Sequence, residues 1–448
     1  MRYEALKTEL DQKLISYRKP MERMFYFFFA LGFLYEYLTS SMLYNPLQNA
    51  LLSALSIFPI RAVEMLFYGI INLRYLIIFP AIYTIICEVK NMRGRIILSL
   101  LLFSGWFYAL YWRSDPECPV FYALLVIVAC AGRDIKKIFK ISLIIGAVMI
   151  VISFILSQTG IIDDLVWQRP GGDLRIRHAF GMIYCTDLAS HVMFLIFLYM
   201  FIKRGKLKFT EYLLILTLVL VNVLFVDGQI AAICTLLAMA GCVYYSVARG
   251  KKITIPQIIL KIRNLLMISS FTFCAALQFI LAILYRDDPD IWYNRYYSLE
   301  NRIRTNYRLL KSFPFSWFGT DFLQVGLGGT EETPTYYFWV DCSYTRLYAM
   351  YGIVAFVIFM GLLTWIVIRL MKKKNYFGMF LMAVIALDLM IEHHIIEIAY
   401  NTFLVLAFAN LDSLSAGNRD LLPDSCLKEN ISEQKQPEPI SDPASDQN

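Results

Sequence analysis

The sequence predicts an all-α polytopic membrane protein with about twelve transmembrane helices, and three observations support this fold class. Apolar residues fill 58% of the 448 positions and charged residues only 17%, whereas a water-soluble domain has about 45–50% and about 25%. The mean hydropathy is +0.55. The apolar residues gather in runs of roughly 20, the length that a helix needs to cross the hydrocarbon core. Together these observations exclude a disordered, collagen-like or disulfide-scaffold chain.

Twelve apolar runs follow one another along the chain, although the fourth and the twelfth are short. The segment 45–62 fits either an interfacial helix or part of a bent span. The expected spans lie near residues 24–42, 64–87, 96–113, 119–132, 141–158, 184–202, 210–226, 229–247, 264–285, 344–368, 375–392 and 395–411.

Lys and Arg gather at alternate connections between these runs. Because cytoplasmic loops carry an excess of positive residues, this pattern places both termini in the cytoplasm, which requires an even number of spans. Three parts are therefore expected: a cytoplasmic N-terminus (1–23), a transmembrane domain (24–411) and a cytoplasmic tail (412–448). The tail is rich in Pro, Ser, Asp and Gln and has no apolar period, so it is expected to be disordered. The net charge of +7 then sets orientation and does not indicate nucleic-acid binding.

Two expected outer loops depart from this charge pattern. The first, about 159–183, carries Arg169, Arg175 and Arg177. The second, about 286–343, carries five Arg and one Lys between residues 286 and 311. Long loops cross the membrane largely regardless of charge, so the topology stands. A cationic surface outside the membrane still requires an explanation.

The second loop contains the sequence LENRIRTNYRLLK, residues 299–311, which has helical spacing. It predicts an amphipathic helix on the outer membrane surface. Its cations either reach lipid phosphates as a solvated face or bind an anionic headgroup, for which the planar guanidinium of Arg is well suited. The apolar stripe is Ile303, Tyr307 and Leu310, and the cations around it are Arg302, Arg304, Arg308 and Lys311.

The first loop ends with RIRHAFGMIYCTD, in which Arg177 and Asp187 lead into the sixth run. Arg177 is either an interfacial anchor or a second phosphate clamp. Asp341 and Tyr344 begin the tenth run in DCSYTRLYAMYG. Asp341 either caps that helix or contacts an acceptor hydroxyl. Arg74 needs a partner on a neighbouring span or a bound anion.

The outer end of the eleventh run carries Glu392, His393 and His394, followed by Glu397 and Asn401. If the segment is helical, positions 394, 397 and 401 share one face. The group is either a satisfied structural network or a proton-transfer site, because His and carboxylates accept protons from hydroxyl nucleophiles. Two adjacent His without a third ligand give little reason to expect a metal. The nine Cys have no metal-ligand spacing, so no metal and no cofactor is expected.

At these residues the chain resembles the Wzy-type bacterial polysaccharide polymerases, which belong with the O-antigen polymerases and ligases. The segments RHAFG, NRIRTNYRLLKSFPFSWFGTD, DCSYTRLYAMYG and EHHIIEIAYNTF occur in the family's order and look like its Arg-x-x-Phe-Gly, Arg-helix-Pro-Gly, Asp-x-x-Tyr and Glu-His…Tyr-Asn patterns. Two departures are visible. Asp187 stands where the family commonly has Asn, and Gly319-Thr320-Asp321 replaces a Gly-x-Gly.

The resemblance implies a GT-C-like glycosyltransferase in the bacterial plasma membrane that needs no metal. Its substrates would be oligosaccharide repeat units on undecaprenyl pyrophosphate, which it would join into a capsule, an exopolysaccharide or O-antigen. Membrane lipids, a chain-length regulator and a flippase are the partners implied. Glu392 or His394 would be the catalytic base. The expected substrate-binding residues are Arg177, Arg302, Arg304, Arg308, Asp341, Tyr344 and Asn401.

Two other functions compete with polymerisation. A ligase that moves a finished glycan to another acceptor would use the same leaving group, so sequence does not separate it from a polymerase. A flippase or secondary transporter would place charge near the bilayer midplane and often shows repeated halves. Here the cations lie mainly in outer loops and no internal repeat is visible, which favours an enzyme at the outer face.

Overall fold

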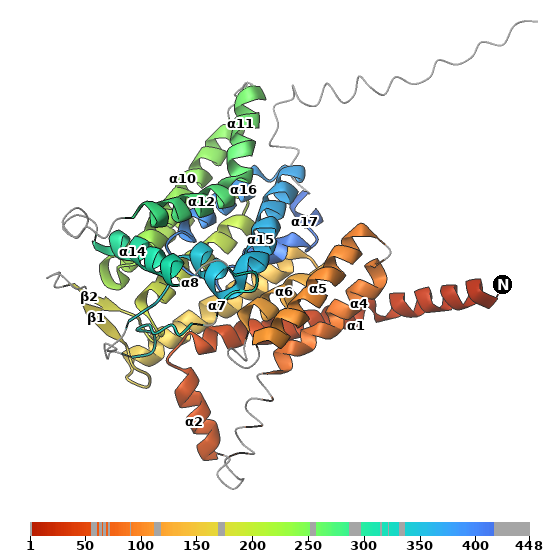
Figure 1. Ribbon diagram of the computed structural model, residues 1–448, viewed down its shortest axis with the longest axis horizontal. Helices are drawn as coiled ribbons and strands as arrows, with labels where there is room; N and C mark the ends of the chain where they lie inside the picture. Colours follow the sequence, from red (N-terminus) through yellow and green to blue (C-terminus); the bar gives the residue numbers. More distant parts are fainter. Residues whose placement is uncertain are drawn as a thin grey trace, which may run out of the picture.

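The computed structural model describes residues 2–54, 61, 65, 69, 72–89, 91–111, 118–168, 175–250, 257–285, 297–313, 316–320, 322–330 and 337–415. The all-α fold class is confirmed for these residues, apart from one short hairpin (Figure 1). The elements are α1 (Arg2–Thr39), α2 (Tyr44–Ala54), η1 (Leu73–Ile77), α4 (Ile78–Glu88), α5 (Met92–Tyr111), α6 (Pro119–Ala129), α7 (Ile135–Gln158), β1 (Val166–Gln168), β2 (Ile176–His178), α8 (Cys185–Ile202), α9 (Phe209–Val221), η2 (Asn222–Val226), α10 (Gln229–Gly250), α11 (Gln257–Ile268), α12 (Ser270–Leu284), α14 (Tyr297–Ser312), α15 (Ser343–Lys372), α16 (Tyr376–Asp388), η3 (Thr402–Ala407) and α17 (Asp412–Ser415).

Six helices among the described residues are long and apolar enough to cross a membrane: α5, α7, α8, α9 with η2, α10 and α15. Helices α11 and α12 meet at an angle of 57° and make a seventh candidate if they are one span. The shorter helices α6 and α16 are also apolar. These helices make the chain a candidate polytopic membrane protein, while the expected count of twelve spans is higher than the count of helices that qualify.

One expected helix is wrong. The twelfth apolar run, 395–411, forms turns and the 3-10 helix η3 instead of a spanning helix. Nearly all of this segment is buried, as are α6, α8 and α16. A segment enclosed by protein can leave the α-helical conformation inside a membrane because neighbouring groups satisfy its backbone. The Arg369 guanidinium, for example, donates to the Ala409 carbonyl at 2.9 Å.

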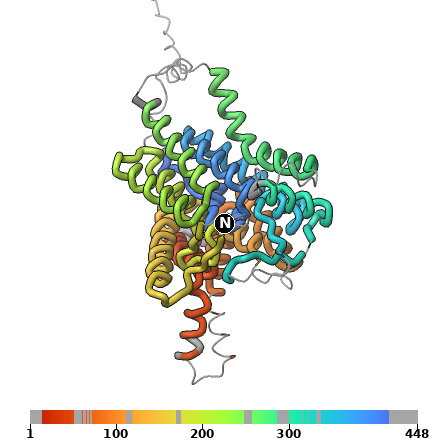
Figure 2. The backbone as a smooth tube through the Cα atoms, turned by 90° about the vertical axis from the view of Figure 1, so that its left-hand side faces the viewer, coloured from red at the N-terminus to blue at the C-terminus, as the bar shows by residue number. Residues whose placement is uncertain are grey.

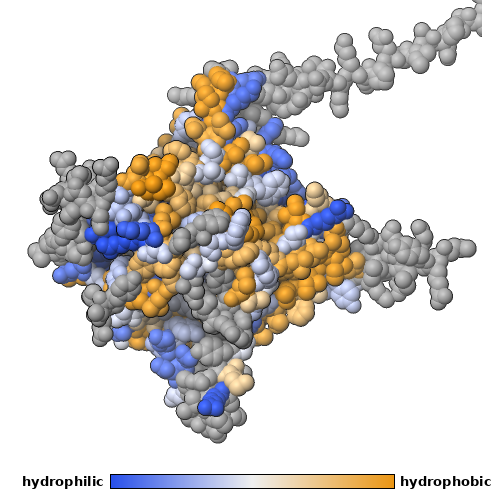
Figure 3. Space-filling model, in the orientation of Figure 1, coloured by the Kyte–Doolittle hydropathy of each residue, from blue (hydrophilic) through white to orange (hydrophobic). Residues whose placement is uncertain are grey.

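The helices around this core turn apolar side chains outward. Helices α5, α7, α9 and α10 each expose several large hydrophobic residues, and hydrophobic residues cover much of the visible described surface in Figure 3. A solvated surface would rarely carry so wide an apolar area, so these faces are the ones that lipid would cover. Helices α2 and α11 project from the body at opposite sides (Figures 1 and 2).

Cations from several connections meet at one end of the molecule, around residues 406–413. Arg93 donates to the Phe408 carbonyl at 2.7 Å, Arg204 donates to the Ser413 carbonyl at 2.8 Å, and Lys373 contacts Asp412 at 2.7 Å. The positive connections near 90–95, 203–208 and 369–374 therefore share one side, as the charge pattern predicts. Helices α8 and α15 end at this side and begin at the other one.

Several expectations lie partly or wholly outside the described residues. Residues 1–23 were expected as a separate terminus, but from Arg2 onward they belong to the continuous helix α1. The first four residues of the tail expected to be disordered, Asp412–Ser415, form α17, and residues 416–448 lie outside the described part. The expectations for Arg169 and Asp321 also fall on residues that are not described.

Helix α15 is interrupted at Gly352, where the segment 317–319 packs against it. Gly352 has a φ of 81°, and an added Cβ would lie 2.4 Å from the Trp317 carbonyl oxygen and 2.3 Å from the Gly319 nitrogen. Only glycine combines this conformation with such a close approach. The backbone of Val354 donates to Trp317 at 3.2 Å. This contact fixes the loop that follows α14 against α15.

Candidate functional site

A cavity of about 920 Å³ lies at the end of the molecule opposite the cationic cluster around 406–413. It forms where the beginnings of α8, α10 and α15 meet α1, α14, the hairpin β1–β2 and the segment after α16. The walls combine apolar and charged side chains. Of the charged ones, four are Arg (Arg74, Arg177, Arg302 and Arg346) and six are acidic (Glu36, Asp187, Asp227, Asp341, Glu392 and Glu397).

Arg302 enters this cavity from α14. The amphipathic helix is confirmed, but it packs against α12 and α15 and does not lie alone on a surface. The buried side chains on α14 include Glu300, Ile303, Asn306 and Leu309, so the buried face is turned from the expected stripe of 303, 307 and 310. Tyr285 of the chain after α12 donates to Glu300 at 2.6 Å, which helps to set this rotation.

Two carboxylates hold the Arg302 guanidinium. Its Nε lies 3.2 Å from Asp341 Oδ2, and its Nη2 lies 3.4 Å from Glu392 Oε1. Burial raises the pKa of Asp341, and Arg302 opposes this shift. Burial disfavours two ionised carboxylates so close together. One of the two can therefore take up a proton, and the pair can also bind a cation.

Asp341 does not cap α15. The N-cap position belongs to Cys342, whose side chain makes no capping hydrogen bond. Asp341 precedes it and points to Arg302, so of the two interpretations drawn from the sequence the cap is wrong. Tyr344, in the first turn of α15, is fully buried and donates to the Ala386 carbonyl at 2.9 Å.

Arg177 reaches the cavity from the antiparallel hairpin β1–β2, which forms in the connection between α7 and α8. Arg177 is paired in register with Trp167. Its Nε lies 3.7 Å from Asp227 Oδ2, and Arg177 is 9% exposed. Asp227 ends the π-helical turn η2 with a φ of 57°, and Asn222 holds the turn by accepting from the Gly228 nitrogen at 3.2 Å. The structure therefore brings Arg177 and Arg302 to one cavity.

Two further Arg residues line the cavity besides Arg177 and Arg302. Arg74 is buried and its guanidinium lies 3.9 Å from the ring centroid of Tyr35 and 5.0 Å from that of Tyr122. Arg346 lies 4.8 Å from the ring centroid of Trp339. Aromatic faces stabilise guanidinium groups. The aromatic rings thus stabilise two cations of the cavity lining, Arg74 and Arg346.

The expected helical face of 394, 397 and 401 does not exist, because residues 389–401 form turns. His394 is fully buried, its Nδ1 lies 2.8 Å from Glu397 Oε2, and its ring stacks on Tyr400 at 3.6 Å. Asn401 is buried and donates to the Ile395 carbonyl at 3.1 Å. Glu392 lines the cavity, whereas His394 and Asn401 do not.

The remaining expected binding residues lie away from the cavity. Arg304 is on the same helix as Arg302, but it contacts Glu300 at 3.7 Å and is not among the lining residues. Arg308 is exposed and also outside the lining. The cationic stripe of the sequence therefore divides, with Arg302 facing inward and the others facing away.

Sequence reasoning missed Asp227 and Arg346 as parts of this site. A single Asp before Gly228, between two apolar runs, was the available signal for Asp227, because charged residues at such positions are costly unless paired. The assembled cavity offers guanidinium groups to an anion and a buried carboxylate to a proton. Searches with this chain find no matching protein-family model, no matching curated protein and no matching solved structure.

Proposed function

We propose that this protein is a glycosyltransferase of the bacterial plasma membrane that polymerises oligosaccharide repeat units carried on undecaprenyl pyrophosphate. The resemblance to Wzy-type polymerases suggests this reaction. The observation that supports it is that Arg177 and Arg302, which lie far apart in the chain, line the same cavity. Two guanidinium groups in one cavity suit the two phosphates of a diphosphate, because each guanidinium makes bidentate contacts with phosphate oxygens.

In the proposed reaction a hydroxyl of one repeat unit attacks the anomeric carbon of the growing chain. The bond between that carbon and the diphosphate oxygen breaks, the undecaprenyl diphosphate leaves with the bonding electron pair, and the hydroxyl proton passes to a base. Negative charge grows on the leaving group, so fixed guanidinium groups stabilise the transition state. Losing one such donor typically costs about 10²–10³ in rate.

Glu392 is the better candidate for the base. It lines the cavity and lies beside Arg302, whereas the His394 ring lies outside the lining, against Tyr400. A general base must lie within hydrogen-bond reach of the proton that it accepts, which a group in the cavity lining can do. His394 and Asn401 would then support the segment that carries Glu392.

The proposal includes a GT-C-like topology with about twelve crossings and both termini in the cytoplasm. The seven span candidates, together with α1, α4, α6, α16 and the irregular segment 389–411, would make up these crossings. The cavity would open to the outer face, opposite the cationic connections. A chain-length regulator and a flippase would act with it in the same membrane.

The decisive experiment uses the purified full chain in detergent with a lipid-linked repeat unit. A polymerase produces a ladder of longer glycans, and Arg177→Ala and Arg302→Ala should each lower the rate of the ladder by about 10²–10³. Arg308→Ala is the matched control, because it removes an exposed Arg from the same helix as Arg302. Absence of any ladder from the wild-type chain would contradict the proposal. Transfer of a finished glycan to another acceptor, without a ladder, would instead identify a ligase.

A secondary transporter is the second candidate function, and the charge of the cavity lining and the irregular elements of the bundle favour it. The cavity lining holds six acidic residues against four Arg, and a helix bent by 57° and an irregular segment lie in the same bundle. Transporters often place broken helices and buried carboxylates at their binding sites. A transporter would move its substrate across sealed proteoliposomes and would make no glycosidic bond in detergent.

A further inference from the structure

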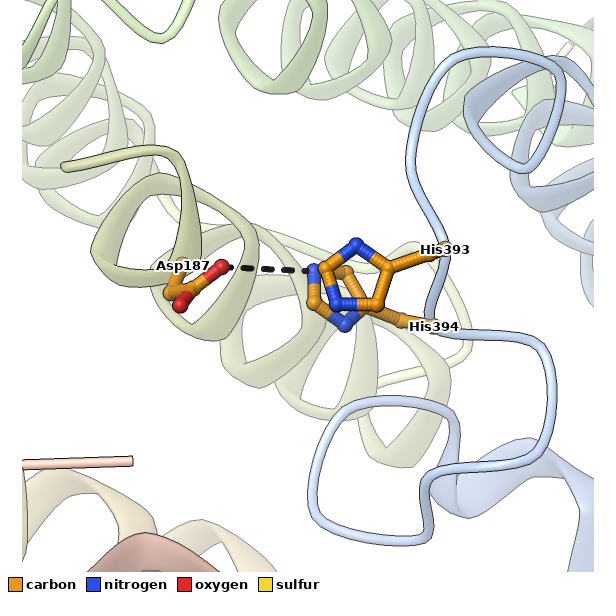
Figure 4. A group of neighbouring side chains, drawn as sticks. All are labelled: Asp187, His393 and His394. Carbon is orange, nitrogen blue, oxygen red and sulfur yellow. Dashed lines mark ion pairs between the residues drawn. The ribbon is translucent and has the colours of Figure 1, made fainter. Parts of the chain in front are cut away.

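Asp187, His393 and His394 come together at the wall of the cavity, although the sequence separates the Asp from the two His. Asp187 lies in the first turn of α8, and both His follow α16 in the irregular segment (Figure 4). One side-chain ligand atom from each of the three residues lies within 4.8 Å of the other two. His394 Nε2 is 4.0 Å from Asp187 Oδ1. The fold thus supplies the third ligand that the pair of adjacent His lacked.

The spacing is close to that of a metal centre. Tetrahedral ligands with bonds of about 2.1 Å lie about 3.4 Å apart. The three donor atoms lie within 4.8 Å of one another, so they would approach one another by about 1.4 Å at most when an ion binds.

The orientation of His394 also matches a metal ligand. Its Nδ1 is held by Glu397 Oε2 at 2.8 Å, which leaves Nε2 directed toward Asp187. Metal-bound His usually donates its other N–H to a carboxylate in this way, which fixes the ring. His394 is fully buried, and its Nε2 has no hydrogen-bond partner within the described part of the chain. The Nδ1 atom of His393 also has no hydrogen-bond partner within the described residues.

The charge of the surroundings favours a cation. The cavity lining has six acidic residues and four Arg, so with all of them ionised it carries an excess of two negative charges. A divalent ion at the cluster would offset that excess. Two imidazoles and one carboxylate suit a transition metal of the zinc kind, whereas Mg²⁺ and Ca²⁺ prefer ligand sets made of oxygen.

We propose that Asp187, His393 and His394 bind one divalent transition-metal ion of the zinc class, with Glu397 holding the His394 ring from behind. Asp187 and His393 line the cavity, so the fourth coordination position faces it and takes water or an anionic oxygen of a ligand. This site follows from the geometry of the cluster and does not depend on the proposed glycosyl transfer.

The test measures metal binding by the purified full chain in detergent. The protein is treated with a chelator and then titrated with Zn²⁺, or with Co²⁺ as a spectroscopic probe, and bound metal is counted by mass spectrometry. We expect about one equivalent per chain and the intense visible absorption of four-coordinate Co²⁺. Asp187→Asn and His394→Ala should lose this equivalent. His178→Ala is the matched control, because it removes a His that also contacts a carboxylate, Asp164 at 2.7 Å, outside the cluster.

Two further variants keep the test decisive if these substitutions unfold the protein. Glu397→Gln should retain the site but weaken Zn²⁺ binding about 10–100-fold, since it removes the carboxylate behind His394. Asp187→Cys should retain Co²⁺ and add a thiolate-to-cobalt charge-transfer band in the near ultraviolet. The proposal is overturned if the folded wild-type chain binds no stoichiometric metal. It is also overturned if folded Asp187→Asn binds Zn²⁺ as tightly as the wild type.

Discussion

Replacing Arg302 with alanine separates the structural role of this guanidinium from its proposed role toward a substrate. The change leaves Asp341 and Glu392 without the cation that lies 3.2 and 3.4 Å from them. Removing one partner of a buried ion pair costs about 3–5 kcal/mol. The Arg302 and Asp341 side chains are 20% and 26% exposed, so water screens part of this cost. We therefore expect Arg302→Ala to lower the free energy of unfolding by about 3 kcal/mol.

The size of this loss should depend on pH, and its sign follows from the carboxylates. Burial raises the pKa of Asp341, and removing Arg302 raises it further because a nearby positive charge is lost. At low pH this carboxyl is protonated in both proteins, so the variant loses little. As the pH rises, the wild type gains the ion pair and the variant does not, so the destabilisation by Arg302→Ala grows as the pH rises to 9.

The assay is unfolding by SDS titration in mixed micelles, followed by tryptophan fluorescence, for wild type, Arg302→Ala, Arg302→Ala/Glu392→Gln and the exposed control Arg308→Ala. The double variant should regain about 1–2 kcal/mol of the free energy of unfolding, because a neutral amide needs no counter-ion. Chain elongation should stay low in the double variant. The reasoning is refuted if Arg302→Ala is as stable as Arg308→Ala at pH 9, or if the double variant recovers full elongation.

Three further predictions follow from the geometry. Gly352→Ala forces a φ of 81° on alanine and places its Cβ 2.4 Å from the Trp317 carbonyl. Backbone strain alone costs about 1–3 kcal/mol, and the clash adds to it, so Gly352→Ala should lower the free energy of unfolding by more than this. An unfolding midpoint equal to that of the wild type would contradict this prediction. Asp227→Asn removes the carboxylate 3.7 Å from Arg177 and should cost about 1–3 kcal/mol in the same titration; no change would mean that the pair contributes nothing. If Glu392 is the base, kcat/KM should fall as decreasing pH protonates its carboxylate, and a pH-independent rate would exclude it.

The sequence predicted the long helices well because their apolar runs are bounded by charged or turn-forming residues. Helices α8 and α10 begin within one residue of the expected positions, at Cys185 and Gln229. The run 395–411 was misread because an apolar segment buried on all sides looks the same whether or not it is helical. Hydropathy records burial, and the backbone conformation depended on contacts with Arg93 and Arg369 from distant parts of the chain.

The candidate site was predicted in part. The Arg of both outer loops and Glu392 were recognised, because charged residues beside membrane segments require an explanation. The separation of Arg302 from Arg304 and Arg308 could not be predicted, since it depends on the rotation of α14 about its axis. Hydrogen bonds set this rotation: Glu300 accepts from Tyr285 after α12, and Asn306 bonds to residues of α12 and α15. The approach of Asp187 to His394 depends on tertiary packing alone.

The central claim is that Arg177 and Arg302 grip one diphosphate, and direct binding of undecaprenyl pyrophosphate to the purified chain tests it. Affinity is measured for wild type, Arg177→Ala, Arg302→Ala and Arg308→Ala in the same detergent. A hydrogen bond to a charged group contributes about 1.5–3 kcal/mol, so each of the first two variants should bind about tenfold or more weakly, and Arg308→Ala should bind as the wild type does. Equal affinity in all four proteins would contradict the account.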